Sequence, residues 1–209
     1  MFDDRTDAGN RLARALGRRD LDIDIVLAIP RGALPVARPV ADALDAELDV
    51  VVARKMGAPQ NPELALGAVA SDGSGWYNDD LIDRLGVSDS YLEDVRKAEA
   101  ENAATKADRY RETSGLPDLD GTRVAIVDDG VATGATATAC LRQVQETDAD
   151  FVALAVPVGS PRSIEQLEAE ADEVIALETP DTFRAVGQFY RTFEQVSDEE
   201  AVAYLDRDR

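Results

Sequence analysis

The stretch VAIVDDGVATGAT occupies residues 124 to 136. Four apolar residues that favour a buried strand run directly into two adjacent carboxylates, Asp128 and Asp129, which are followed by small residues, glycines and threonines. A surface turn before a helix would explain the Asp and Gly residues by backbone preference alone. The alternative is a phosphate-binding turn beside an acidic pair that binds sugar hydroxyls or a metal ion.

The turn after the acidic pair has the properties of a phosphate site. Small side chains let a ligand approach the backbone at Gly130, Ala132, Gly134 and Ala135. The amides from Thr133 to Thr136 are expected to open a helix, whose partly positive end attracts anions, and both threonines add hydroxyl donors. The acidic pair would repel a phosphate bound directly against it. Vicinal ribose hydroxyls or a metal ion are therefore its expected partners.

Outward from this stretch, hydrophobic patterns alternate between strands and helices. Strands are expected at residues 23–30, 49–54, 124–127, 151–158 and 173–178, and helices at 5–19, within 31–44, and at 88–112, 133–146, 163–171 and from 197 onward. A loop at 56–63 and a hairpin over 64–78 interrupt the alternation, and Ser90–Glu93 and Ser197–Glu200 are the expected capping pairs. This order predicts an α/β fold with an open, mainly parallel sheet, helices on both faces and ligands at the carboxyl ends of the strands.

Composition limits the classes of protein that fit. A chain of 209 residues with 44% hydrophobic content predicts a single domain over 1–209, with smaller hood elements from its N-terminal and C-terminal segments. No apolar run approaches the roughly 20 residues of a membrane span, and the first residues lack a signal-peptide pattern, so a cytoplasmic protein is expected. Cys140 is the only cysteine and histidine is absent, which excludes an internal disulfide, a Cys/His zinc site and a histidine base.

The chain is strongly acidic, with a net charge of −20 and only three lysines, Lys55, Lys97 and Lys106. Such a surface repels nucleic acid and anionic membranes, so neither is an expected partner. An acidic, lysine-poor chain is typical of proteins from salt-loving organisms, in which concentrated salt screens the repulsion between carboxylates. We therefore expect a halophilic protein.

The opening stretch resembles the 5-phosphoribosyl 1-diphosphate (PRPP) signature of type I phosphoribosyltransferases, which has two hydrophobic pairs, two acids and a turn ending in Thr-Gly-x-Thr. The resemblance extends to PRGALPV at 30–36, RKMGAPQNPELALGAVA at 54–70 and TPDTFRAVGQFYRTFEQVSDEE at 179–200. These segments look like a bacterial and archaeal group of phosphoribosyltransferase-domain proteins without an assigned substrate. The resemblance implies transfer of a phosphoribosyl group from PRPP to a nitrogenous base or related small-molecule acceptor, with release of pyrophosphate.

The resemblance also implies roles for individual residues. Asp128 and Asp129 would be catalytic and hold the ribose hydroxyls, and Mg²⁺ would be bound mainly through PRPP. The 5′-phosphate would lie in the turn formed by Gly130, Val131, Ala132, Thr133, Gly134, Ala135 and Thr136. Pyrophosphate would contact Arg31, Gly32 and Ala33, together with Arg54 and Lys55. A homo-oligomer, most simply a dimer, is expected.

Several alternatives remain open at this stage. Purine-specific members usually carry an acid where this chain has Ala132, which argues against hypoxanthine or guanine as the acceptor. Residues 109–111 (Arg-Tyr-Arg) are either basic and aromatic site residues or a helix end that complements the helix dipole. The aromatic residues Phe189, Tyr190 and Phe193 form either a hood or core packing. A non-catalytic PRPP or nucleotide sensor, and a phospho-acceptor signalling domain, are the alternative functions.

Overall fold

The computed structural model describes residues 1–19, 21–111 and 115–206. Its centre is a parallel five-stranded sheet in the order β2-β1-β6-β7-β8. The strands are β1 (Ile25–Ala28), β2 (Glu47–Val50), β6 (Arg123–Val127), β7 (Phe151–Val158) and β8 (Glu173–Glu178). β1 and most of β6 and β7 are buried residue after residue, as expected for strands covered on both faces. The predicted α/β fold class is confirmed.

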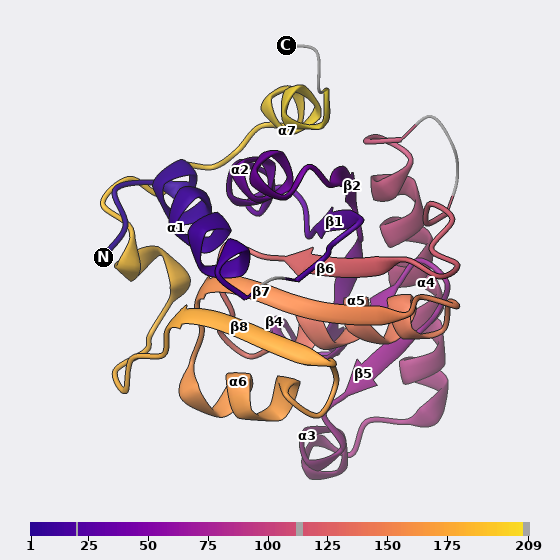
Figure 1. The fold of residues 1–209 in the computed structure, drawn as a ribbon. Helices are drawn as coiled ribbons and strands as arrows, with labels where there is room; N and C mark the ends of the chain where they lie inside the picture. The colour runs from indigo at the N-terminus through magenta and orange to yellow at the C-terminus, as the bar shows by residue number, and fades with distance from the viewer. Residues whose placement is uncertain (20, 112–114, 207–209) are drawn as a thin grey trace.

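Helices cover both faces of this sheet. Figure 1 shows α1 (Arg5–Gly17) and α2 (Leu34–Leu44) on one side, and α5 (Ala135–Gln145) and α6 (Pro161–Leu167) on the other. α1 packs against α2, and its apolar residues Ala8, Leu12 and Leu16 are buried. Since each crossover returns the chain to the same end of the sheet, the loops after β1 and β6 meet at the carboxyl edge.

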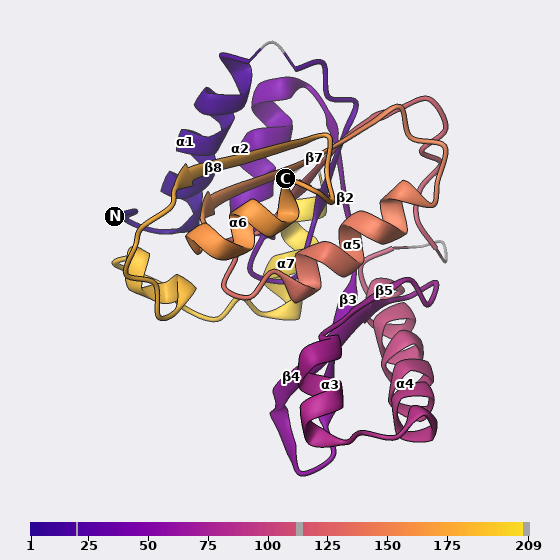
Figure 2. The same cartoon turned by 90° about the horizontal axis from the view of Figure 1, so that it is seen from below.

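A second, antiparallel sheet forms a lobe beside the first. It contains β3 (Ala53–Ala58), β4 (Asn61–Ala70) and β5 (Gly75–Tyr77), and Figure 2 shows it projecting from the main sheet together with α3 (Asp79–Leu85) and α4 (Asp89–Ala107). The predicted strand 49–54 was wrong, because it divides between β2 and β3. The predicted loop 56–63 was also wrong. Its ends belong to β3 and β4, whose pairing shifts register around Gly57 and leaves only residues 59 and 60 as the turn.

Several helix boundaries also differ from the prediction. The N-cap of α4 is Ser88, whose side chain accepts a hydrogen bond from Tyr91 N, and not the predicted Ser90. The predicted helix 88–112 ends at Ala107, and its last residue lies outside the described residues. The Ser197–Glu200 capping box is confirmed and opens α7 (Asp198–Leu205). α3 and the short 3-10 helix η1 (Val186–Phe189) were not predicted.

The two terminal segments meet near the carboxyl edge of the main sheet. Phe2 N donates to Phe189 O at 2.8 Å, and Arg191 N donates to Phe2 O at 2.9 Å. The rings of Phe2 and Tyr190 pack with centroids 5.3 Å apart, and both residues are buried. Among the residues described, no helix has the length and apolar character required to cross a bilayer.

Candidate functional site

The loop after β1 and the acidic pair after β6 are in direct contact. A Cβ atom placed on Gly32 would lie 2.3 Å from Asp129 Oδ2, so only a glycine fits there without displacing the carboxylate. Ala33, the next residue, is fully buried at the start of α2. The structure therefore brings together two predicted site segments that are far apart in the sequence.

The phosphate turn lines a small cavity of about 170 Å³. The cavity is bordered by Asp128, Gly130, Val131, Ala132, Thr133, Gly134, Thr136, Ala137 and Val186. Gly134 has φ 80° and caps α5, and the first hydrogen bond of the helix runs from Thr138 N to Gly134 O at 2.8 Å. The amides of the first helical turn precede that bond, so they have no partner within the helix and can bind an anion.

The turn is held from behind by the segment that joins β7 to α6. Val131 N donates to Val158 O at 2.8 Å, and Ser160 N donates to Val131 O at 2.9 Å. The hydroxyls of Ser160 and Ser163 both donate to Ala132 O, at 2.9 and 2.7 Å. A turn fixed in this way presents its amides without reorganisation when a ligand binds.

The acidic pair is partly buried, and its electrostatics follow from that burial. Asp129 N donates to Asp128 Oδ1 at 2.8 Å. Burial raises the pKa of Asp128 well above the ordinary carboxyl value, and the neighbouring charge of Asp129 raises that pKa further. Burial also raises the pKa of Asp129, although Arg5 opposes this shift. A cationic or hydroxylic ligand at this pair would relieve the cost of ionising both groups.

Arg5 is a site residue that the sequence analysis missed. Its Nε donates to Asp129 Oδ2 at 2.8 Å, its Nη1 donates to Glu194 O at 2.6 Å, and its guanidinium lies 3.8 Å from the centroid of the Phe193 ring. Tyr190 Oη donates to Asp129 O at 2.5 Å. Phe193 therefore packs against Arg5, and Tyr190, which belongs to a buried cluster with Phe2, contacts the backbone of Asp129. No local pattern marks Arg5, because in sequence it is an ordinary polar residue at the start of an amphipathic helix.

Arg31, the predicted pyrophosphate ligand, bonds to a carboxylate of the chain itself. Its Nη1 lies 3.2 Å from Asp198 Oδ1, at the start of α7. Tyr110 Oη donates to the same oxygen at 2.8 Å, and Arg109 Nη1 lies 3.8 Å from Asp198 Oδ2. Burial, followed by the bond to Asp198, raises the pKa of Tyr110 to about 12. Arg109 and Tyr110 thus lie beside the predicted pyrophosphate loop, whereas Arg111 is buried against Asp49 at 2.7 Å.

The two predicted cations on β3 differ in their surroundings. Arg54 Nε donates to Glu99 Oε2 of α4 at 3.1 Å. Since successive side chains of a strand point to opposite faces, Lys55 points to the other face from Arg54. Lys106 of α4, which was not predicted, lies at the pyrophosphate loop and donates from Nζ to Pro30 O at 2.7 Å. The structure thus places Arg54 and Lys106, more clearly than Lys55, on the side of the site that faces α4.

The carboxylates of the acidic pair suit a magnesium ion that is held mostly by the oxygens of a bound phosphorylated molecule. No cluster of three or more carboxylate, thiol or imidazole groups suited to a metal occurs in the described ranges. Mg²⁺ retains several non-protein ligands and is commonly bound through one or two carboxylates plus phosphate oxygens. Asp128 and Asp129, at the mouth of the phosphate turn, fit that pattern.

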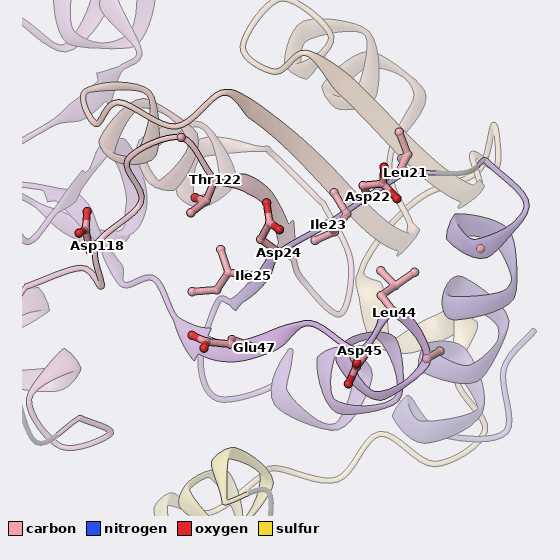
Figure 3. Close-up of a pocket in the computed structure, with 13 residues that line it drawn as sticks. Leu21, Asp22, Ile23, Asp24, Ile25, Leu44, Asp45, Glu47, Asp118 and Thr122 are labelled. Atoms are coloured by element: carbon pink, nitrogen blue, oxygen red, sulfur yellow. The ribbon is translucent and has the colours of Figure 1, made fainter.

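A larger hollow lies at the opposite edge of the main sheet and has different chemistry. Figure 3 shows this cavity, of about 990 Å³, around the amino ends of β1, β2 and β6. Its acidic lining residues are Asp22, Asp24, Asp45, Glu47 and Asp118. Carboxylates repel phosphorylated ligands, and parallel sheets bind ligands at their carboxyl edge, so the smaller cavity is the candidate site.

Sequence comparison places the whole arrangement in a family. The family described as "Phosphoribosyl transferase domain" matches residues 3–194. The provisionally named phosphoribosyl transferases MT0597 and Rv0571c, from two strains of Mycobacterium tuberculosis, are each 44% identical to this chain over 207 residues. The match covers 99% of this chain and 47% of each relative, so the chain spans about half the length of these curated relatives.

Solved structures agree in fold. TT1426 from Thermus thermophilus superposes with a TM-score of 0.82 at 43% identity, covering 98% of this chain and 97% of that one. A hypothetical protein from Neisseria gonorrhoeae with bound ppGpp has a TM-score of 0.52 at 15% identity, covers 100% of this chain and 99% of its own, and shows only the shared fold. These matches give no support to a phospho-acceptor signalling domain. With its acidic pair and phosphate turn at the predicted edge of the sheet, the chain belongs to the phosphoribosyl transferase domain family.

Proposed function

We propose that the protein binds PRPP together with Mg²⁺ and transfers its phosphoribosyl group to a nitrogenous base or a related small-molecule acceptor, releasing pyrophosphate. One observation carries the proposal. The phosphate turn and Asp128 border the same cavity, and the adjacent Asp129 touches Gly32 of the loop after β1. The segments to which the proposal assigns the 5′-phosphate, the sugar hydroxyls and the pyrophosphate therefore lie side by side, which supports the binding of a ligand with the connectivity of PRPP.

Each half of the site has its own task in this proposal. The turn from Gly130 to Thr136 binds the 5′-phosphate through backbone amides and threonine hydroxyls. Asp128 and Asp129 accept hydrogen bonds from the ribose hydroxyls, and their charge favours a sugar ring that becomes cationic as the bond to the diphosphate breaks. The acceptor nitrogen then forms the new bond at the anomeric carbon, while Arg31 binds the departing pyrophosphate. A magnesium ion held by the ligand and the acidic pair would supply further charge neutralisation.

Binding and turnover are tested separately. Calorimetry with PRPP in the presence and absence of magnesium should show heat that depends on the metal. Pyrophosphate release is then assayed over a panel of bases, with the Thr136→Val variant as a weakened reference. Absence of heat under both conditions would remove PRPP from the proposal, whereas binding without pyrophosphate release from any base would leave the binding role alone.

A sensor that binds PRPP or a nucleotide without turnover is the second candidate. It is favoured by the state of Asp129, whose carboxylate already pairs with Arg5 at 2.8 Å. Ala132 also lacks the acid that purine-specific members use at this position. The Neisseria gonorrhoeae protein of the same fold, solved with ppGpp, is an example of nucleotide binding on this architecture. The proposed homodimer remains an expectation, which size-exclusion chromatography with light scattering would test.

A further inference from the structure

Lys106 lies at the candidate site, although neither the local sequence around it nor the family match assigns it a role. It lies near the end of α4, and its Nζ reaches across to Pro30 O, directly before Arg31. The side chain therefore joins the lobe to the loop after β1. Pro30 follows β1, so the ammonium group lies at the carboxyl edge of the main sheet, where the acidic pair also lies.

Within the described ranges, no carboxylate lies at ion-pair distance from this ammonium group, although Asp198 and Asp128 are near enough to interact with its charge. Its hydrogen-bond acceptor among the described residues is Pro30 O, and the other hydrogens of the ammonium group remain available as donors. By contrast, the neighbouring cations are compensated, because Arg31 bonds to Asp198 and Arg54 bonds to Glu99. Among the residues described, a partly buried lysine without a direct ion pair is unexpected in a chain with a net charge of −20.

The surroundings of Lys106 disfavour its positive charge in the absence of a ligand. Burial lowers the pKa of Lys106, and the nearby charges of Arg54 and Arg31 lower it further, while Asp198 opposes the shift. Three cations gathered at one edge, with a single unpaired ammonium among them, are unfavourable until an anion arrives. An anion with two phosphate groups would offer oxygens to several of these cations at once.

We propose that Lys106 is a further binding residue for the pyrophosphate part of the ligand, acting with Arg31 and Arg54 across the junction between the lobe and the main sheet. This inference rests on the proposed function. The hydrogen bond from Lys106 to Pro30 O orients the ammonium group, whose remaining donors contact the diphosphate of PRPP or the released pyrophosphate. A charge at this position stabilises the negative charge that accumulates on the leaving group.

The test compares the two halves of the ligand on the full chain. Lys106→Gln removes the charge but keeps a donor for Pro30 O, whereas Lys106→Arg keeps the charge. The control is Lys97→Gln on the same helix, because Lys97 is exposed and pairs with Glu93. Binding of inorganic pyrophosphate and of ribose 5-phosphate is measured by calorimetry with magnesium present. Lys106→Gln should weaken pyrophosphate binding about tenfold or more and leave ribose 5-phosphate within about twofold.

The remaining outcomes separate this inference from the proposed function. Lys106→Arg should stay close to the wild type for both ligands, and Lys97→Gln should match the wild type. Equal weakening of both ligands by Lys106→Gln, or wild-type binding of pyrophosphate by that variant, would overturn the role of Lys106 while PRPP binding by the wild type still stood. A wild-type chain that binds neither PRPP nor pyrophosphate would overturn both.

Discussion

Arg5 and Asp129 form an ion pair across 124 residues of sequence, with 2.8 Å between Nε and Oδ2. Both side chains are largely buried, at 11% and 15% exposure. Removing one partner of a buried pair leaves an uncompensated charge, which costs about 3–5 kcal/mol. We expect Arg5→Met to lower the free energy of unfolding by about 3 kcal/mol, measured by urea denaturation.

The control for this prediction lies on the same helix. Arg14 is exposed near the end of α1, so Arg14→Met should change stability by less than about 0.5 kcal/mol. The double variant Arg5→Met with Asp129→Asn should recover part of the loss, because no buried charge is left unpaired. A double variant that is as unstable as the sum of the two single variants would show that the pair is not coupled.

Asp128 should destabilise the unliganded protein as the pH rises. Burial raises its pKa in the folded state above the ordinary value of 3.8, so the folded protein keeps this proton to a higher pH than the unfolded chain does. Stability is therefore lost as the pH rises from about 4 through the raised pKa. We therefore expect the Asp128→Asn variant to be more stable than the wild type at neutral pH. Each kcal/mol gained in the free energy of unfolding should raise the thermal midpoint by about 2–4 °C.

Scanning calorimetry over a pH series checks the sign of this effect. Below about pH 4 both the folded and the unfolded wild type carry the proton, so the two proteins should melt together there. Asparagine can still accept the hydrogen bond from Asp129 N, which isolates the charge as the variable. A difference that is constant at every pH would assign the effect to packing.

The acidic pair and the phosphate turn should respond differently in kinetics. Asp129→Asn keeps the size and polarity of the side chain but removes a charge that favours a cationic transition state, so turnover should fall far more than PRPP affinity. Thr136→Val removes a hydroxyl that the proposed function assigns to the 5′-phosphate, so it should weaken ground-state and transition-state binding alike, by about 1.5–3 kcal/mol. Steady-state kinetics and calorimetry on both variants, with Thr147→Val as a control at the far end of α5, make the comparison.

The carboxylate of Asp198 should compete with pyrophosphate for Arg31. The two groups lie 3.2 Å apart, and the bond from Tyr110 followed by that from Arg31 keeps the pKa of Asp198 below its ordinary value. Asp198→Asn should therefore bind pyrophosphate more tightly, by up to about fivefold, given the modest strength of exposed ion pairs. The measurement is a calorimetric titration of this variant with pyrophosphate. The control is the Asp206→Asn variant, at the other end of α7.

Salt should stabilise the protein. The net charge of −20 opposes the compact state, and screening grows as the Debye length falls to about 3 Å at 1 M salt. Thermal midpoints should rise from low to molar potassium chloride. Midpoints that stay flat or fall would contradict the halophilic expectation. Sodium sulfate at equal ionic strength serves as the comparison, because sulfate also strengthens apolar burial and a larger rise in sulfate would reveal that contribution beside charge screening.

The main sheet could be predicted because its strands are short apolar runs followed by turn residues. VAIV at 124–127 and FVALAVPV at 151–158 are buried on both faces, and this pattern survives in the structure. The lobe could not be predicted in the same way. MGAPQNPE contains glycine and prolines, which indicate a loop, yet β3 and β4 accommodate them at a register shift and a turn.

The part of the candidate site formed by consecutive residues could be predicted, whereas the part formed by contacts between distant segments could not. The phosphate turn follows from consecutive residues, 130–136, with backbone properties that can be read in order. The contacts of Arg5 and Lys106 depend on where α1 and α4 pack, and no local spacing encodes either partner. Charged residues on helices are usually solvated, so a polar position alone gave no reason to single them out.

The contact between the two terminal segments, where Phe2 packs on Tyr190, has a consequence for synthesis on the ribosome. The acidic pair, the phosphate turn and the serines that hold the turn have all emerged once residue 163 is made, but Tyr190 and Phe193 follow later. At about 5–20 residues per second, the nascent chain spends several seconds with Arg5 and Asp129 present but without Glu194 to hold the guanidinium. The order of translation therefore makes these contacts a late event, and a nascent chain arrested before Tyr190 would leave Asp129 O without the hydrogen bond from the Tyr190 hydroxyl.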